Sequence, residues 1–376
     1  MIEVIRCGLL TTVQDLGRFG YEMAGVSPSG AMDATLAEVA NAIVGNSEDA
    51  AVLELTWIGP ELLFTDDAWI AICGADMDAK VDGTSVPRNR IIQVSSGAKL
   101  TFAAAKHGAR TILAVAGGID VPLVLGSRST HVHARMGGYE GRALRPGDVL
   151  KTGILRESTA TWLRKQPMRR QSNSVQVSSW AVRFPHELSD GLLDGLGMGD
   201  GLGGGVAHKW GDGLGGLGGG SGGRRANGDD WSEAATIRLI PGPEFLWFSD
   251  ETRQMLTKTP YQLTQASNRM GYRLAGMPLS HAHNHHLWSS AVTFGTVQVP
   301  PDGQPVILMA ERQTTGGYPR LGVVASVDGP RLAQLRPGHQ VRFTWIDVRA
   351  AQLLLKKQRN VVSQLKTLLR HSGGVC

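Results

Sequence analysis

Three polar segments of the sequence combine arginine, glycine and hydroxyl side chains: residues 117–130, 267–273 and 311–318. Arginine presents a planar fork of donors that suits a carboxylate or a phosphate. Glycine lets backbone N–H groups approach an anion closely, and serine and threonine add short donors. Each segment taken alone fits a polar turn between strands. Together they predict a pocket for an acidic small molecule, or for negative charge that develops during acyl-type chemistry.

Other residue patterns favour no metal, nucleotide or biotin site. The imidazoles of His281–His286 could bind zinc or copper, but no nearby carboxylate or cysteine completes a ligand set, so a polar surface loop is the favoured interpretation. The chain has no Gly-x-x-x-x-Gly-Lys-Ser/Thr phosphate loop and no Ala-Met-Lys-Met sequence that would carry biotin. Asp15 and Asp33 are candidate acids, although Asp33 also fits a helix N-cap.

The composition is that of a globular protein that binds neither nucleic acid nor membrane. The chain has 376 residues, is 42% hydrophobic and carries a net charge of +5. Charges of both signs are mixed along most of it, whereas nucleic-acid binding needs a concentrated basic face. Its three scattered cysteines fit neither a metal site nor a disulfide framework. With no signal-peptide pattern and no apolar stretch of about 20 residues, we expect a cytoplasmic protein.

The elements that must position these residues are mainly short strands bounded by turns, which favours barrels or sandwiches. One helix is expected from Asp33 to Val44, because apolar residues recur there at three- and four-residue spacing and Gly45-Asn46 ends the pattern. The Asp82-Gly83 pair predicts a tight hairpin. The expected strands are 2–5, 51–55, 62–64, 69–72, 79–81, 91–94, 100–102, 110–115, 237–240, 272–274, 291–299, 306–310, 323–327 and 339–345.

A glycine-rich tract, residues 186–232, separates two β-rich regions. Glycine loses the most backbone entropy on ordering and offers little to bury, so we expect a flexible insertion, disordered from about residue 190 to 228. The predicted organisation is an N-terminal β domain (1–155), a linker with this insertion (156–235), a C-terminal β domain (236–350) and a basic amphipathic helix and tail (351–376).

Four long segments resemble one known family. They are GLLTTVQDLGRFGYEMAGVSPSGAMD (8–33), LAVAGGIDVPLVLGSRST (113–130), SNRMGYRL (267–274) and TVQVPPDGQPVILMAERQTTGGYPRLGVV (296–324). The family is the KipA-like or allophanate-hydrolase subunit 2 family. It includes the C subunit of bacterial ATP-dependent 5-oxoprolinase and is related to the carboxyltransferase domain of urea carboxylase. Glu311 and Asn268 stand where that family usually has aspartate, and His131 stands where an acidic residue is frequent.

The resemblance implies two cyclophilin-like β-barrel domains joined through the glycine-rich insertion. It also implies a hydrolase subunit that opens 5-oxoproline (pyroglutamate) to glutamate, with ATP used by the complex to form a phosphorylated intermediate. The implied partners are two further subunits, one KipI-like and one LamB/YcsF-like, and the implied substrate is a small acid. The chain itself would carry no covalently attached biotin.

The residues that the resemblance and the polar segments assign to the site fall into two groups. The predicted catalytic residues are Arg128, Arg269, Glu311, Thr314 and Thr315. The predicted substrate-binding residues are Ser127, Ser129, Thr130, Asn268, Tyr272, Gln313, Gly316, Gly317 and Tyr318. We expect the two arginines and the loop 313–317 to line one cleft between the two barrels, although Arg269 could instead pair with a nearby acid. No metal site is expected.

Two other functions remain open from the sequence. One is a carboxyltransferase component that uses carboxylated biotin delivered by another protein. The other is a non-enzymatic regulator that binds a KipI-like partner.

Overall fold

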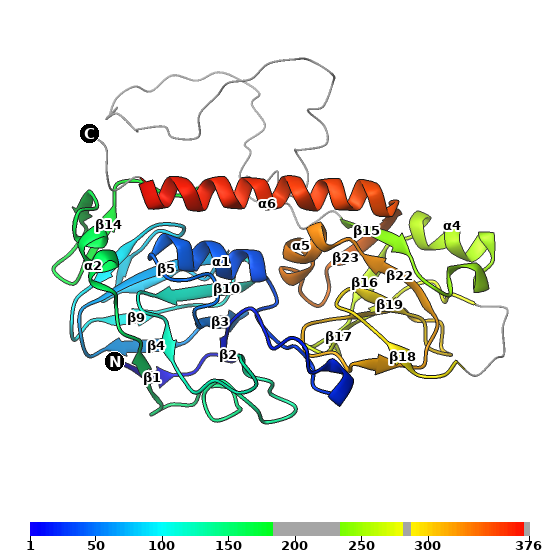
Figure 1. Ribbon diagram of the computed structural model, residues 1–376, viewed down its shortest axis with the longest axis horizontal. Coiled ribbons are helices and arrows are strands. Elements are labelled where there is room, and N and C mark those ends of the chain that lie inside the picture. The colour runs from blue at the N-terminus through cyan, green and yellow to red at the C-terminus, as the bar shows by residue number, and fades with distance from the viewer. Residues whose placement is uncertain (183–233, 281–286, 372–376) are drawn as a thin grey trace, which may run out of the picture.

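The computed structural model describes residues 1–182, 234–280 and 287–371, and it forms two β-rich halves joined side by side beneath one long helix (Figure 1). The predicted insertion at 190–228 and the cluster His281–His286 lie outside the described residues. Among the helices described, none combines the length and the apolar character needed to cross a membrane.

The N-terminal half consists of two seven-stranded sheets. In spatial order, the first is β11 (Ile119–Asp120), β12 (Val149–Thr152), β1 (Ile2–Arg6), β4 (Glu61–Phe64), β9 (Lys99–Thr101), β6 (Lys80–Val81) and β7 (Thr84–Ser85). The second is β13 (Met168–Arg170), β14 (Val175–Ser178), β8 (Ile92–Val94), β5 (Ala68–Asp76), β10 (His107–Val115), β3 (Val52–Thr56) and β2 (Leu10–Gln14).

The C-terminal half is a closed barrel. Its strands, in order around the barrel, are β15 (Ala235–Pro241), β22 (Arg320–Val324), β19 (Thr296–Gln298), β20 (Val306–Leu308), β17 (Gly271–Ala275), β16 (Tyr261–Leu263) and β23 (Gln340–Trp345). A separate two-stranded sheet pairs β18 (Ser290–Ala291) with β21 (Thr315–Gly316). This arrangement confirms the predicted fold class, a mainly β protein of two barrel-type domains with few helices.

Helices cover the sheets rather than form the cores. They are α1 (Ala34–Ile43), α2 (Glu157–Arg164), α4 (Asp250–Lys258), α5 (Gly329–Ala333) and α6 (Val348–His371), with 3-10 turns η1 (Glu22–Ala24), η3 (Phe245–Trp247) and η4 (Ser326–Asp328). The α1 helix begins where expected, because Asp33 accepts the Leu36 N–H at 2.9 Å. The Asp82-Gly83 hairpin also forms, with both residues at positive φ (47° and 80°).

Each half has its own hydrophobic core. In the N-terminal half, one face of each sheet points into a shared core, and the other face of the second sheet is covered by α1. Strands β5 and β10 are therefore buried on both faces, which is why their sequences read as continuous apolar runs. The barrel encloses a separate core, which Met32 of the N-terminal half also enters.

Residues 157–178 correct the predicted linker, which was expected to begin at residue 156. They form α2, β13 and β14, and β14 pairs with β8 to extend the second sheet. The prediction missed these strands because β13, with the sequence MRR, has one apolar residue and β14, with the sequence VQVS, has two.

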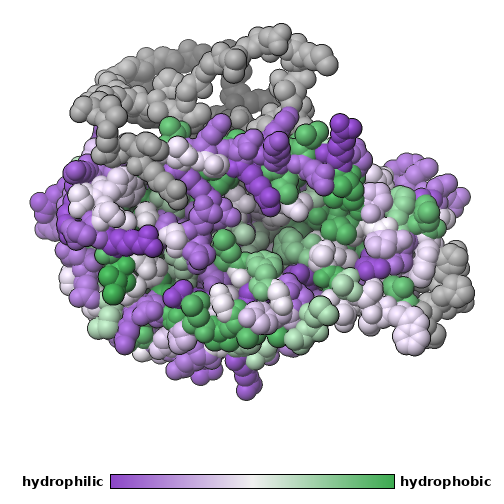
Figure 2. All heavy atoms as spheres, viewed as in Figure 1, coloured by the Kyte–Doolittle hydropathy of each residue, from purple (hydrophilic) through white to green (hydrophobic). Residues whose placement is uncertain are grey.

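The long α6 helix begins three residues before the predicted amphipathic helix and tail (351–376), and it spans both halves (Figure 1). Its apolar residues Val362 and Leu369 pack on the α1 layer, and Ala351 packs beside η4 near the barrel. Lys366 ties it to the N-terminal half through a 3.1 Å ion pair with Glu48. Hydrophilic side chains gather along this edge of the molecule (Figure 2).

Candidate functional site

Arg269, a predicted catalytic residue, is buried where the two halves meet. It precedes β17 of the barrel and donates to Glu311 at 2.6 Å, to the backbone oxygen of Gly30 at 2.6 Å, and to Glu54 on β3 of the N-terminal half. Burial opposes its charge, but the two carboxylates outweigh burial and raise the pKa of Arg269. With both carboxylates and a carbonyl bound, this guanidinium positions Glu311 and joins the halves.

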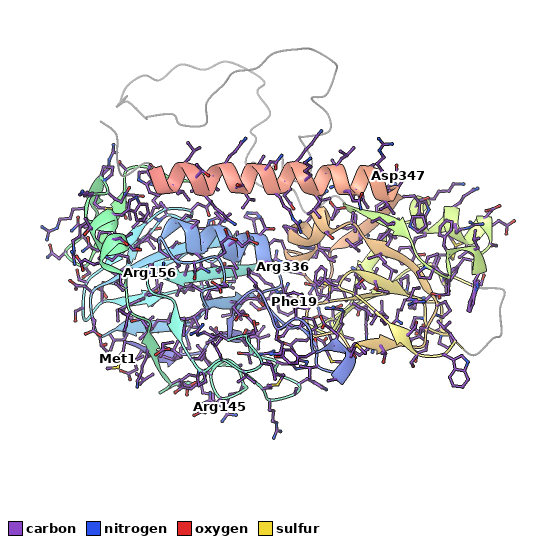
Figure 3. All side chains as sticks on the ribbon, viewed as in Figure 1. Met1, Phe19, Arg145, Arg156, Arg336 and Asp347 are labelled. Carbon is purple, nitrogen blue, oxygen red and sulfur yellow. The ribbon has the colours of Figure 1, made fainter. Side chains whose placement is uncertain are left out.

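Tyr272 belongs to the same junction rather than to an open surface. Its ring is buried in the barrel core, and its hydroxyl accepts a 2.7 Å hydrogen bond from Arg110 on β10. Burial raises the pKa of the Tyr272 phenol. Gln334 adds further bonds across the junction, accepting the N–H groups of residues 109 and 110 at 3.0 Å each. Figure 3 labels Arg336 at this junction, where it donates to the Ala105 carbonyl at 2.9 Å.

The hydroxyls of the first polar segment are engaged within the N-terminal half. Asp15 accepts from the Ser127 hydroxyl at 2.7 Å, from the Arg128 N–H at 2.5 Å and from the Ser129 hydroxyl. Thr130 bonds the backbone of β2 through both its N–H and its hydroxyl, at 2.9 Å each. Ser127, Ser129 and Thr130 are fully buried. Arg128 is partly exposed as a residue, and its Nε donates to the Val121 carbonyl at 3.1 Å.

His131 connects this first segment electrostatically with Glu311. The Ala134 N–H donates to His131 Nδ1 at 3.0 Å, so the neutral ring carries its proton on Nε2. Burial lowers the pKa of His131, the Glu311 carboxylate opposes that shift, and the charges of Arg18 and Arg269 add to it. Arg18 is itself 1% exposed, and its Nη1 has no hydrogen-bond partner among the residues that the structure describes.

The loop after Glu311 is held by close packing at one glycine. Gly316 lies in β21, and a Cβ there would come 2.3 Å from Nε2 of the buried Gln298. Thr314 and Thr315 precede it, and in the described part of the chain their hydroxyls make no hydrogen bond. Gly317 is exposed. The loop therefore offers two free hydroxyls next to a fixed backbone.

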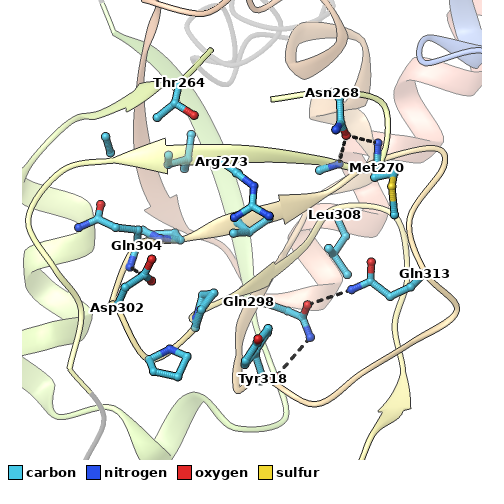
Figure 4. A pocket seen from close by; sticks show the side chains of 17 residues that line it. Thr264, Asn268, Met270, Arg273, Gln298, Asp302, Gln304, Leu308, Gln313 and Tyr318 are labelled. Carbon is cyan, nitrogen blue, oxygen red and sulfur yellow. Dashed lines mark hydrogen bonds between the residues drawn. The ribbon is translucent and has the colours of Figure 1, made fainter. Parts of the chain in front are cut away.

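A pocket of about 730 Å³ lies beside this loop (Figure 4). Three predicted site residues line it: Asn268, Gln313 and Tyr318. The others are Thr264, Met270, Gly271, Arg273, Leu274, Ala275, Gln298, Pro300, Pro301, Asp302, Gln304, Pro305, Val306 and Leu308. Gln298 joins the wall, since Gln313 donates to it and it donates to the Tyr318 carbonyl, at 3.4 Å each.

The structure thus brings together the second and third polar segments, through the contact of Arg269 with Glu311 and through the pocket. Arg128 and Arg269 do not line that pocket, so it is not the single cleft expected between the two arginines. The roles assigned to the individual residues stay predictions. In the described ranges, no group of three or more His, Cys, Asp or Glu side chains could hold a metal ion.

Several residues of this region were not among the predicted site residues. Glu54 and Arg110 sit inside strands that the sequence marks only as apolar runs, and only the fold shows that they face the barrel. The sequence could have indicated Arg273. Neighbouring residues of a strand point to opposite faces, so a buried Tyr272 places Arg273 on the outer face of the same strand. Gln298 carried no signal beyond its place near the end of the expected strand 291–299.

Comparisons with known proteins agree over almost the whole chain. A family model described as carboxyltransferase domain, subdomain A and B, matches residues 24–189 and 220–345. The chain is 33% identical to the 5-oxoprolinase C subunit of Escherichia coli (strain K12) over 373 residues, 99% of this chain and 100% of that protein. It is 30% identical to urea amidolyase of Lachancea kluyveri over 97% of this chain and 18% of that protein.

A solved structure of a urea carboxylase is also similar to this chain. The crystal structure of the Kluyveromyces lactis urea carboxylase matches with a TM-score of 0.75 and 27% identity, covering 97% of this chain and 29% of that chain. The match therefore concerns one part of a longer protein.

Proposed function

This chain belongs to the family of the carboxyltransferase domain, subdomains A and B, and we propose that it is one of the subunits of an ATP-dependent 5-oxoprolinase. The complex hydrolyses 5-oxoproline to glutamate. Two further subunits, one KipI-like and one LamB/YcsF-like, complete it, and ATP is consumed by the assembly.

The observation that carries the proposal is the end-to-end match with a protein of that name. The alignment covers 99% of this chain and 100% of the Escherichia coli protein. A second 5-oxoprolinase C subunit, from Haemophilus influenzae, is 30% identical over 98% of this chain and 99% of its own length. The urea amidolyase match instead covers 18% of that protein.

Hydrolysis of the lactam needs hydrogen-bond donors that stabilise negative charge on oxygen. A lactam resists hydrolysis because its amide is resonance-stabilised, and ATP supplies activation of the amide oxygen. Thr314 and Thr315 have free hydroxyls and orient the substrate in this proposal. Arg269 acts by positioning Glu311, which it holds at 2.6 Å. Arg128, which is partly exposed as a residue, holds an anionic group.

The test replaces the two free hydroxyls. In the assembled complex, the double variant Thr314→Val, Thr315→Ala should form glutamate from 5-oxoproline and ATP about 10- to 100-fold more slowly, because lost transition-state donors cost rates of that order or more. Thr344→Val is the matched control, since Thr344 is exposed on β23 and does not belong to the loop 311–318. Unchanged turnover in a folded, assembled double variant would remove this loop from the chemistry.

A second candidate function is carboxyl transfer, favoured by the family model and by relatives named urea amidolyase and putative urea carboxylase. Here the chain would accept carboxylated biotin from another protein. One reagent, avidin, distinguishes the two functions. Glutamate formation that persists when avidin captures all biotin supports the oxoprolinase, and activity that needs carboxylated biotin supports the transferase.

A further inference from the structure

The floor of the barrel pocket is a row of side chains on the outer face of three adjacent strands. Arg273 on β17 pairs with Val306 on β20, and Val306 pairs with Gln298 on β19. Residues at alternate positions, such as Tyr272 and Ile307, point into the barrel core. Strand alternation therefore places Arg273, Val306 and Gln298 side by side on the pocket floor.

Arg273 is the central charged group of this floor (Figure 4). Its backbone is fixed, since its N–H donates to the Ser267 hydroxyl at 3.0 Å and its carbonyl accepts from the Thr264 N–H at 2.9 Å. In the described structure Arg273 forms hydrogen bonds through its backbone, and its guanidinium makes no hydrogen bond or ion pair. Gly271, two residues earlier on the same strand and the same face, has no side chain that could cover the guanidinium. A fixed strand thus presents an unpaired planar donor to the open pocket.

The remaining walls suit a ligand with amide groups and an apolar body. Gln298 and Gln313 supply side-chain amides whose own contacts are long, at 3.4 Å, so a ligand can replace them. The Gln304 amide is bonded in both directions to the backbone of Gly276, at 3.0 and 3.2 Å. Pro300, Pro305 and other apolar residues form the sides. The one carboxylate, Asp302, already accepts from the Gln304 N–H at 3.0 Å and forms no ion pair with Arg273.

We propose that this pocket is a binding site for a small carboxylic acid that also carries an amide, with Arg273 holding the carboxylate. The identity of that acid as 5-oxoproline rests on the proposed function. A volume of about 730 Å³ exceeds that of 5-oxoproline and falls in the range of about 300–1,000 Å³ that holds larger ligands. The pocket therefore also admits acylated amino acids of greater size.

Binding is measured by calorimetry, with the full chain alone and in its complex. The probes are 5-oxoproline, N-acetylglutamate as a larger acid with an amide, and pyrrolidin-2-one, which keeps the lactam and lacks the carboxylate. One of the two acids should bind, and pyrrolidin-2-one should bind about 10- to 100-fold more weakly, as expected for loss of a charged hydrogen bond. Arg273→Met should weaken binding of the acid by the same factor. Arg273→Lys should weaken it less, because lysine keeps the positive charge but lacks the planar pair of donors.

The control is Arg342→Met, which removes an exposed arginine from β23 of the same barrel, outside the pocket. It should leave binding unchanged. The proposal is overturned if the acid binds Arg273→Met as tightly as it binds the unaltered chain. It is also overturned if neither acid binds the chain or the complex. Normal glutamate formation by Arg273→Met overturns the assignment of 5-oxoproline to this pocket and leaves the proposed function standing. Acid binding in a complex without glutamate formation supports the pocket and removes the proposed function.

Discussion

Replacing Arg269 with methionine tests whether the junction of the two halves depends on one buried cation. Arg269 is 5% exposed and binds Glu54, Glu311 and the Gly30 carbonyl, so its removal leaves two carboxylates buried without their main partner. Glu54 is 1% and Glu311 4% exposed, so water cannot readily replace the lost contacts.

The magnitude follows from these contacts. Removing one partner of a buried ion pair costs about 3–5 kcal/mol, mostly because the remaining charge stays desolvated. Glu54 keeps a weaker contact with Arg110 at 3.8 Å and still accepts the Met32 N–H at 2.7 Å, which places the cost in the lower half of that range. Adding Glu311→Gln should restore part of the loss, because a neutral amide then replaces one unpaired carboxylate.

Urea denaturation gives the free energy of unfolding, and hydrogen exchange at residues 27–33 and 52–56 reports on the junction itself. We expect faster exchange there in Arg269→Met and unchanged values in Arg342→Met, whose side chain is exposed. A loss below about 1 kcal/mol, or no gain from Glu311→Gln, would refute the reasoning, because a buried unpaired charge costs more.

Two further predictions concern Asp33 and Gly316. Burial raises the pKa of Asp33 from 3.8 to about 7, so the folded state favours its protonated form. This carboxyl therefore stabilises the protein least at high pH: its contribution is full below about pH 4 and is lost as the pH rises through 7. Asp33→Asn should be more stable relative to the unaltered chain at pH 8 than at pH 5, and a pH-independent difference would contradict this. For Gly316→Ala, the added methyl lies 2.3 Å from Gln298 Nε2 and must displace the amide. Unfolding free energy should fall by about 1–3 kcal/mol and binding at the pocket should weaken; unchanged thermal stability and binding would show that the loop shifts freely.

The sequence predicted the elements that depend on local signals. The α1 helix has its cap at Asp33 and its stop at Gly45, and the Asp82-Gly83 hairpin requires positive φ at both residues, so a few neighbouring residues determine each of them. Family membership was likewise visible in long motifs. Strand β2, in contrast, was not predicted, because its sequence LTTVQ is largely polar. In the structure Thr11 and Thr12 are buried, with Thr11 donating to the Cys7 carbonyl and Thr12 accepting from Gln14.

The candidate site was predictable only in part, because its key contacts join distant residues. Arg269 meets Glu54 across 215 positions of sequence, and no local pattern marks that pair. Burial of Ser127 and Ser129 depends on Asp15, more than 110 residues earlier. Which face of β17 carries Arg273 follows from alternation, but the pocket above it is built by loops whose paths the sequence does not determine.

The closure of the barrel has a consequence for how the chain is made. Its first strand, β15, pairs in parallel with its last, β23, from Ala235 opposite Val341 to Leu239 opposite Trp345. This ring can therefore close only after β23 has left the ribosome, whereas the described strands of the N-terminal half lie within residues 2–178 and can pair earlier. The α6 helix, which spans both halves, follows the barrel in the sequence. Synthesis therefore permits the N-terminal half to form before the barrel, and the barrel before the helix that covers both.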